Sequence, residues 1–253
     1  PLRHLAYAFR LLFAQSKKVN PRGDISPFNA LMTALSGAVG TGNIVGVATA
    51  IHLGGPGALF YMWLVALIGM AISFTEATCG VKFRQKDHHG RVVGGPMFYI
   101  REALMNTNPG LGRLLAALYA FLTALSVLSI GNMVQINSIA AILAQDFGVQ
   151  TWLTGILVMG LVGVVILGGI KRIADLAGKL VPFMIVLYLL SGVFILVQNA
   201  AQILPMFLLI IREAFTVQAV SGGVFGGGIV AAMRYGVSRG IFSNEAGIGT
   251  GSI

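Results

Sequence analysis

Small and polar residues interrupt an apolar stretch near the start of the chain, Leu35–Ala48 (LSGAVGTGNIVGVA). The stretch contains four glycines, with Thr41 and Asn43 between them. Because glycine weakens a helix by about 0.5–1 kcal/mol relative to alanine, this density predicts a broken helix. A break presents backbone N–H groups to an anion and carbonyl groups to a cation. The stretch is therefore a candidate binding site for charged groups of either sign.

The surroundings of this stretch place it at membrane depth, because no charged residue occurs from Ile25 to Thr75. Hydrocarbon tolerates non-helical backbone only where protein, water or a ligand satisfies its polar groups. The alternative is close helix packing through the GxxxG pair Gly42 and Gly46. Packing alone does not need Asn43, so binding is the favoured interpretation.

A second glycine-rich stretch resembles the first. Ser221–Ala232 (SGGVFGGGIVAA) aligns with Ser36–Val47 (SGAVGTGNIVGV). Paired glycine-interrupted segments in the two halves of a membrane protein are typical of a transport site.

The composition defines the class of protein and the number of its spans. With 56% hydrophobic and 10% charged residues, the chain is predicted to be a multi-span membrane protein. One partial transmembrane domain covers residues 1–253, and residues 1–26 form a cytoplasmic or interfacial segment. Asp24 or Ser26 is expected to cap the first span. The spans are predicted at about 27–53, 58–81, 114–145, 151–170, 180–197 and 217–234.

Lys and Arg residues fall on alternate connections between these spans. Sixteen of the 17 lie on one side, and Arg212 alone lies on the other. This distribution predicts a multi-pass cell-membrane protein with its N-terminal segment and the tail after the sixth span in the cytoplasm. It also argues against nucleic acid as a partner, since the +9 net charge marks topology.

Polar residues in the spans are further candidates for function. Ser129, Asn132 and Gln135 step by three along the third span, where they either join helices or face a cavity, and the cavity is favoured for Gln135. Glu76 and Glu245 are gating candidates, the latter paired with Arg239 or a basic loop. The alternative for both is a solvated carboxylate. The spans contain no GxSxG or HExxH motif, so the chain is not expected to be an enzyme.

Five motifs carry a resemblance to the alanine or glycine:cation symporter family, the sodium-coupled amino-acid transporters of bacteria and archaea. These are Leu35–Ala50 (LSGAVGTGNIVGVATA), Leu53–Trp63 (LGGPGALFYMW), Gly94–Phe98 (GGPMF), Gly131–Ser138 (GNMVQINS) and Arg239–Gly249 (RGIFSNEAGIG). That family is similar in fold to the leucine-transporter group, an all-α inverted-repeat helix bundle. The resemblance implies an N-terminal-half fragment: the first five-helix repeat and the first helix of the second, with helices 1 and 6 interrupted.

The resemblance also implies roles for individual residues. Backbone N–H groups of Gly40, Thr41 and Gly42 would meet the substrate carboxylate, and Gln135 would approach its amine. Freed carbonyls of Gly226, Gly227 and Gly228 would supply further acceptors. Ala38 and Asn43 would bind a first sodium ion. Ser36 and Val39 would bind a second, which is incomplete here because its other ligands belong to helix 8.

The predicted function is therefore sodium-coupled symport of a small neutral amino acid, alanine or glycine. Gly226 and Gly228 leave space that a side chain would fill, so the pocket should be small. The expected partners are the amino acid, Na⁺ as coupling ion and the lipid bilayer, with no other cofactor. The alternatives are a channel, since channels also use carbonyl cages, and a non-transporting membrane subunit.

Overall fold

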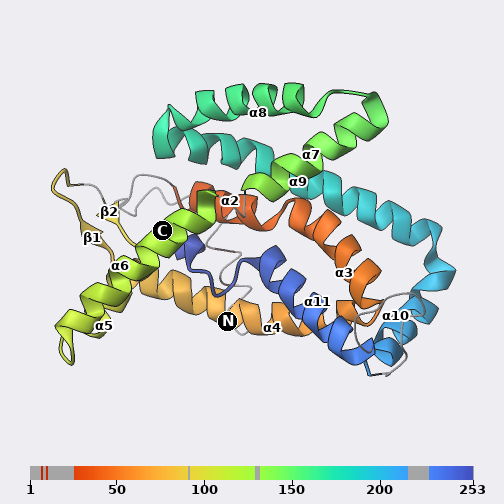
Figure 1. Ribbon diagram of the computed structural model, residues 1–253, viewed down its shortest axis with the longest axis horizontal. Coiled ribbons are helices and arrows are strands. Elements are labelled where there is room, and N and C mark those ends of the chain that lie inside the picture. Colours follow the sequence, from red (N-terminus) through yellow and green to blue (C-terminus); the bar gives the residue numbers. More distant parts are fainter. Residues whose placement is uncertain are drawn as a thin grey trace. The chain divides into compact units, whose positions relative to one another are not determined.

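The computed structural model describes residues 7, 10, 26–90, 92–128, 132–215 and 228–252. Within these ranges the regular structure is helical except for one short hairpin, in which β1 (Gln85–Lys86) pairs antiparallel with β2 (Val92–Val93) (Figure 1). The chain forms two compact units. Unit 1 comprises Pro1–Ala34, Ile72–Gly178 and Ile248–Ile253, and unit 2 comprises Leu35–Ala71 and Lys179–Gly247.

The first helix begins and breaks where the sequence predicts. At the start of α2 (Pro27–Ala38), the Asn29 backbone N–H donates to Ser26 Oγ at 3.2 Å. The helix ends at Ala38, and a π-helical turn, η2 (Gly42–Gly46), leads into α3 (Val47–Gly54). The two parts are bent by 41° at the break. The predicted interruption is therefore confirmed.

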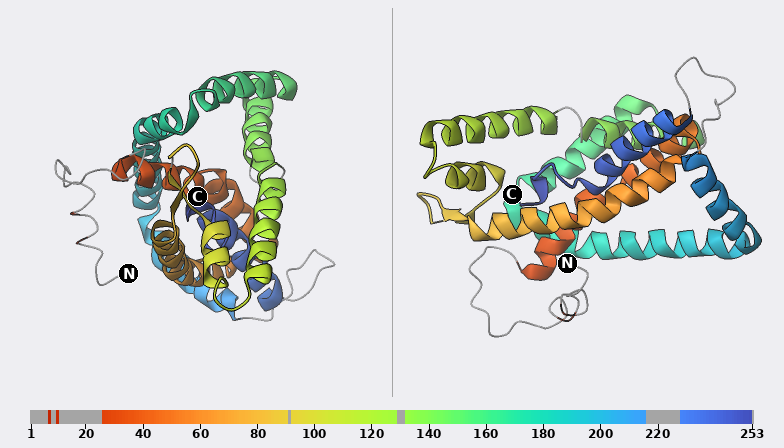
Figure 2. Two further views of the ribbon diagram at one scale, coloured as in Figure 1. Left: turned by 90° about the vertical axis from the view of Figure 1, so that its left-hand side faces the viewer. Right: turned by 90° about the horizontal axis from the view of Figure 1, so that it is seen from below.

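In unit 2, α11 (Gly228–Asn244) packs along η2 and α3 in the opposite direction (Figures 1 and 2). A β-carbon on Gly54 would lie 3.1 Å from Tyr235 Cβ, and one on Gly42 would lie 3.4 Å from Phe242 Cδ1. Because both positions are glycine, the two backbones can approach closely. The C-terminal end of α11 therefore lies beside the break.

The first part of α4 (Ala58–Lys82) and α10 (Ala200–Ala214) complete the packing of unit 2. The buried Tyr61 hydroxyl donates to the Ala214 carbonyl at 2.9 Å. The Trp63 and Phe207 rings stack with centroids 5.8 Å apart.

Alanine at Gly236 should destabilise the protein, because its β-carbon would meet the Ala58 carbonyl oxygen and lie 2.7 Å from Tyr61 Cβ. Overpacking of this kind costs about 1–3 kcal/mol, so a lower melting temperature is expected in detergent. The matched control is Gly192→Ala, since no heavy atom lies within 4 Å of a β-carbon there. Equal melting temperatures for the two variants would contradict this packing.

Unit 1 contains two helix pairs. α5 (Pro96–Ala103) packs on α6 (Pro109–Ser126), and α7 (Asn132–Phe147) packs on α8 (Thr151–Ile166). Asn108 caps α6, because its side chain accepts from the Leu111 N–H at 3.1 Å. The unit also holds the 3₁₀ turn η4 (Thr250–Ser252).

Three predicted helix boundaries differ from the structure. α6 and α7 cover the predicted third span, but α6 begins earlier, at Pro109, and residues 129–131 between the two helices lie outside the described residues. The fifth span is part of α9 (Gly169–Gln198). The basic residues between the fourth and fifth predicted spans therefore lie within a helix; they are Lys171, Arg172 and Lys179. Gly169 has φ 72°, which lets the chain turn sharply and begin the helix early.

The sixth span was predicted over 217–234, whereas α11 runs from Gly228 to Asn244. The predicted span ends at Arg234. The helix continues past Arg234 and Arg239, since long basic side chains can carry their charge away from an apolar surface. Residues 216–227 lie outside the described residues.

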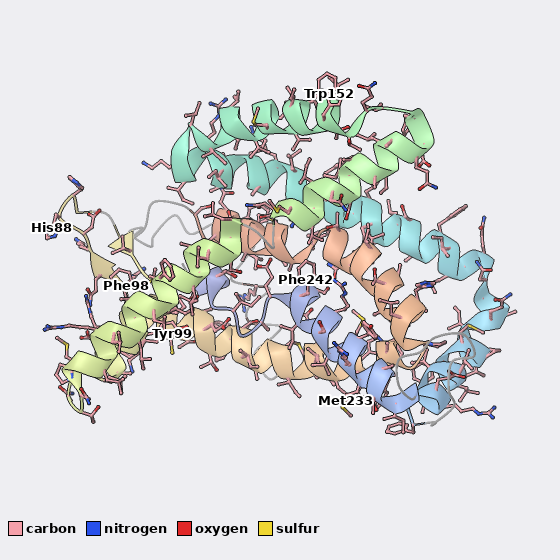
Figure 3. The ribbon with its side chains drawn as sticks, in the orientation of Figure 1. His88, Phe98, Tyr99, Trp152, Met233 and Phe242 are labelled. Atoms are coloured by element: carbon pink, nitrogen blue, oxygen red, sulfur yellow. The ribbon has the colours of Figure 1, made fainter. Side chains whose placement is uncertain are left out.

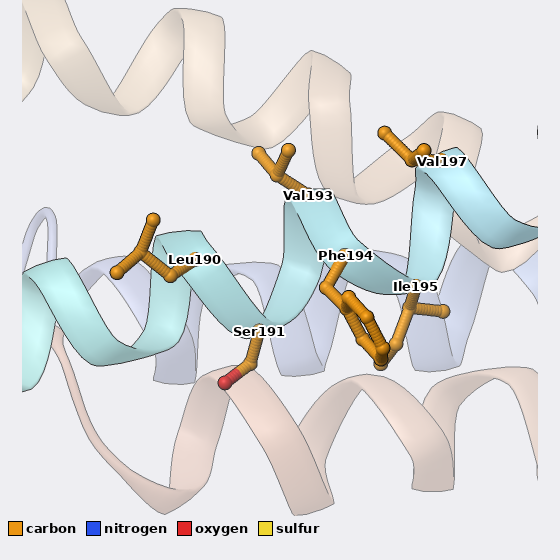
Figure 4. A pocket seen from close by; sticks show the side chains of 6 residues that line it. All are labelled: Leu190, Ser191, Val193, Phe194, Ile195 and Val197. Carbon is orange, nitrogen blue, oxygen red and sulfur yellow. The ribbon is translucent and has the colours of Figure 1, made fainter.

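Among the described residues, α4, α6 and α9 are long and apolar enough to cross a membrane, and the bent α2–α3 pair makes a fourth if it is one span. α8 is apolar but shorter. This pattern supports an all-α membrane protein. One shallow apolar groove on α9 is lined by Leu190, Ser191, Val193, Phe194, Ile195 and Val197 (Figure 4). Its one polar side chain, Ser191, donates to the Leu187 carbonyl, so the groove suits lipid rather than a polar ligand.

Candidate binding site at the broken helix

Asn43 is the centre of the polar contacts at the break. Its side-chain Nδ2 donates to the Ala38 carbonyl, and its Oδ1 accepts from Ser243 Oγ. Its backbone N–H donates to the Gly40 carbonyl at 3.1 Å. The structure therefore brings together Ala38 and Asn43, which the family resemblance assigns to one ion.

Ser243 contacts Asn43 at the break and is not among the candidates that the sequence provides. It is only 7% exposed and lies near the end of α11. Its position in the run Ser243-Asn244-Glu245 was a signal, because three consecutive polar residues follow a glycine-rich helix. The contact joins residues 200 apart in sequence, so periodicity alone does not find it.

α11 ends beside the break, and the chain then leaves helical geometry. A β-carbon on Gly42 would lie 3.5 Å from Ser243 Cα. Glu245, Gly247 and Gly249 follow with φ values of 52°, 90° and 84°. Within the described residues, the end of α11 is thus a second helix end beside the break in the first helix. The break predicted around residues 226–228 lies partly outside it: Gly226 and Gly227 are not described, and Gly228 is the first residue of α11.

Glu245 lies against the end of α2. A β-carbon on Gly37 would be 3.0 Å from Glu245 Oε2. Arg239, proposed above as its partner, has its guanidinium 5.9 Å from the Phe242 ring centroid. Phe242 is labelled on α11 in Figure 3. The carboxylate thus reaches the broken helix, in the same unit as Asn43.

Open space and an unsatisfied polar atom occur at the break itself. No heavy atom lies within 4 Å of a β-carbon placed on Gly40. The buried Thr41 Oγ1 has no hydrogen-bond partner. Buried hydroxyl groups are normally hydrogen-bonded, so Thr41 is suited to contact a ligand. Gly42 packs against Phe242 instead of facing open space.

The remaining predicted site residues are less informative. Ser36 lies in the last turn of α2, and Val39 follows in the bend. Gln135 is exposed on α7 in unit 1, so its role stays a prediction. His88 lies in the exposed turn of the β-hairpin (Figure 3). In the described ranges, no three His, Cys, Asp or Glu side chains gather as a metal site.

The GGPMF motif has a structural role in unit 1, where it contacts the end of the chain. A β-carbon on Gly94 would lie 3.2 Å from the Gly80 carbonyl oxygen and 3.6 Å from that of Ser252. The Tyr119 hydroxyl donates to the Ile248 carbonyl at 2.7 Å. The motif, Gly80 and Tyr119 therefore form a seat for residues 248–252.

Glu76, a gating candidate, lies beside this seat. Burial raises the pKa of the Tyr99 phenol above its usual 10.0, and the charge of Glu76 raises that pKa further. Ser252 hydrogen-bonds to the Tyr99 side chain and opposes the shift. The phenol therefore stays neutral at physiological pH and remains a hydrogen-bonding group. A gating role for Glu76 stays a prediction.

These features define a class: a helical membrane protein in which one helix breaks and a second ends beside it, joined by carbonyl, amide and hydroxyl groups. Comparison with known proteins specifies the family. The model of the sodium:alanine symporter family matches residues 1–253, and the chain belongs to that family.

Several curated relatives are similar over nearly the whole chain. The sodium/alanine symporter AgcS of Methanococcus maripaludis is 46% identical over 249 residues, which are 98% of this chain and 54% of that protein. The putative sodium/proton-dependent alanine carrier protein YrbD of Bacillus subtilis is 41% identical, covering 99% of this chain and 49% of the relative. The probable sodium/glutamine symporter GlnT of Bacillus subtilis is 38% identical, covering 96% and 52%. The chain thus spans about half the length of the curated relatives it matches.

Proposed function

We propose that this chain contributes the sodium and substrate site of a symporter that carries a small neutral amino acid, alanine or glycine, into the cell. The observation that carries the proposal is the position of Asn43 between the Ala38 carbonyl and Ser243. Membership of the sodium:alanine symporter family supports sodium as the coupling ion.

The groups around Asn43 suit a sodium ion. Na⁺ is a hard cation, and neutral carbonyl and amide oxygens bind it without adding charge. A half-turn of the Asn43 amide would direct Oδ1 towards the Ala38 carbonyl and Nδ2 towards Ser243. The Ser243 hydroxyl can accept as well as donate, so it remains hydrogen-bonded in both orientations. Ala38 and Asn43 can then bind the ion together.

The substrate carboxylate is proposed to lie in the open space at Gly40. There it would meet backbone N–H groups of the break and the Thr41 hydroxyl, which has no hydrogen-bond partner. An adjacent sodium ion would balance its charge. Each ligand then raises the affinity of the other by the same factor, which is the thermodynamic basis of coupled transport.

The wider architecture is proposed by resemblance. The chain would form the first repeat of a leucine-transporter-like bundle and the first helix of the second. Gln135 would approach the substrate amine, and carbonyls of residues 226–228 would supply further acceptors. Ser36 and Val39 would contribute to a second sodium site. The N-terminal segment would be cytoplasmic in a multi-pass cell-membrane protein.

The names of the relatives include alanine and glutamine carriers, so substrate size is a property to measure. A small pocket requires that alanine and glycine compete with each other and that glutamine competes poorly.

Uptake of labelled alanine into proteoliposomes containing the full-length protein tests the proposed function. We expect an inward sodium gradient to drive alanine above its equilibrium level, and choline replacement to remove this accumulation. Glycine should compete with alanine. Downhill sodium current without accumulation would indicate a channel, and absence of alanine binding would indicate a packing subunit.

A further inference from the structure

We propose that the outer face of the β1–β2 hairpin binds the anionic headgroups of membrane phospholipids. The outer face is the row of exposed side chains Lys82, Arg84, Lys86 and His88. The hairpin belongs to unit 1, whereas Asn43 belongs to unit 2, so lipid binding here is independent of the sodium and substrate site proposed above.

The basic residues of this segment all lie on one side of the extended chain. From Lys82 to His88 the side chains alternate without exception: residues 82, 84, 86 and 88 are exposed, and residues 83, 85 and 87 are half-buried. Side chains of an extended strand point to opposite sides in turn, and those on one side recur about every 7 Å. Lys82, Arg84 and Lys86 therefore form a row of three cations, which His88 continues at the turn (Figure 3).

Contacts of the inner side chains hold the row in this orientation. Arg101 Nη2 donates to Gln85 Oε1 at 2.6 Å, which ties β1 to α5. The His89 backbone N–H donates to Asp87 Oδ1 at 2.8 Å, so the acidic side chain of the segment is held in the turn. Turning the basic row inward would cost both of these hydrogen bonds.

The hairpin begins where α4 ends. α4 is long and apolar enough to cross a membrane, and its 25 residues extend about 37 Å, whereas a hydrocarbon core is about 30 Å thick. Its last residue, Lys82, therefore reaches the headgroup layer. Phe74 and Val81, which are exposed and two helical turns apart on one face of α4, precede the basic row. An apolar helix face followed by basic side chains matches the acyl chains and the phosphate of a phospholipid.

The chemistry of the row favours lipids with a net negative charge. The Arg84 guanidinium can donate two parallel hydrogen bonds to phosphate oxygens, and Lys86 adds a second positive charge. Long basic side chains can also extend from the end of an apolar helix to the headgroups. Each basic residue near an anionic lipid surface contributes about fivefold in affinity, which corresponds to about 1 kcal/mol.

The test measures protection by phosphatidylglycerol against thermal unfolding of the purified full-length protein in neutral detergent micelles. Phosphatidylcholine with the same acyl chains is the reference, and it should protect less. We expect the double variant Arg84→Gln/Lys86→Gln to raise the phosphatidylglycerol concentration for half-maximal protection at least tenfold. Without phosphatidylglycerol its melting temperature should equal that of the unsubstituted protein, because both side chains are exposed.

Gln85→Glu is the matched control. It changes the net charge by the same amount as Lys86→Gln and at the neighbouring residue, but on the inner face, where the new carboxylate would meet Arg101. Lys86→Gln should raise the phosphatidylglycerol midpoint about fivefold, and Gln85→Glu less than twofold. Equal shifts would show that net charge decides the affinity, and would contradict a role for the outer face.

An unchanged phosphatidylglycerol midpoint in the double variant would overturn the proposal. Equal protection of the unsubstituted protein by inorganic phosphate at the same concentration would also overturn it, because it would indicate a site for small anions instead of a lipid surface. If the double variant is not recovered folded, Lys86→Gln alone decides: a raised midpoint supports lipid binding by this face, and an unchanged one rejects it.

Discussion

Replacement of Asn43 by leucine should abolish sodium-stimulated alanine uptake, with a loss of at least a hundredfold. Leucine has the same number of side-chain heavy atoms and the same branching, but it offers no oxygen to a cation and no donor to the Ala38 carbonyl. The change would also leave the buried Ser243 hydroxyl without its acceptor, and an unsatisfied buried polar group costs about 1–3 kcal/mol. The measurement is the sodium-dependent component of uptake in proteoliposomes.

Two further variants separate a binding role from a structural one. Asn199→Leu is the matched control. Asn199 Nδ2 donates to the Ile195 carbonyl at 2.9 Å, as Asn43 Nδ2 donates to the Ala38 carbonyl. Asn199, however, is exposed at the start of α10. Uptake by that variant should be normal. Asn43→Asp keeps an oxygen ligand and should retain a sodium response with an altered midpoint. Full sodium-stimulated uptake by Asn43→Leu would contradict the proposed ion site.

Alanine at Gly249 should remove transport and lower the melting temperature by several degrees. With φ at 84°, an L side chain at this position is strained by about 1–3 kcal/mol. Its β-carbon would also meet the Pro96 ring and lie 2.7 Å from Tyr119 Oη, so the bond from Tyr119 to the Ile248 carbonyl would be lost. Uptake and thermal melting are measured on the same preparation.

The control for this prediction is Gly251→Ala, two residues further along. No heavy atom lies within 4 Å of a β-carbon on Gly251, and its φ is not positive. Uptake by Gly251→Ala and its melting temperature should therefore be close to those of the unsubstituted protein. A normal Gly249→Ala variant would show that the seat of residues 248–252 is not needed for transport.

Local sequence predicted the features that depend on local energetics. The glycine density around Gly40 predicted the break, and Ser26 was one of two caps considered for the first span. The pairing of Ala38 with Asn43 came from a family resemblance, and the structure brings these residues together. In each case the partners are close in sequence.

Contacts between distant segments could not be predicted in this way. The predicted sixth span ends at residue 234, and this prediction places Ser243 in a cytoplasmic tail. Only the packing of α11 against α3 shows that this segment returns to the break. The sequence gives no structural role for the GGPMF motif for the same reason. Gly94 of the motif lies close to Ser252, but the two residues are far apart in sequence.

The left-handed backbone of Glu245 implies a conflict between folding and transport. Glycine at this position would relax the backbone by about 1 kcal/mol, so a screen for heat-resistant variants could select it. The same exchange would delete the carboxylate that lies against α2 and is a gating candidate. A heat-resistant variant selected at residue 245 should therefore be assayed for transport as well as for melting temperature.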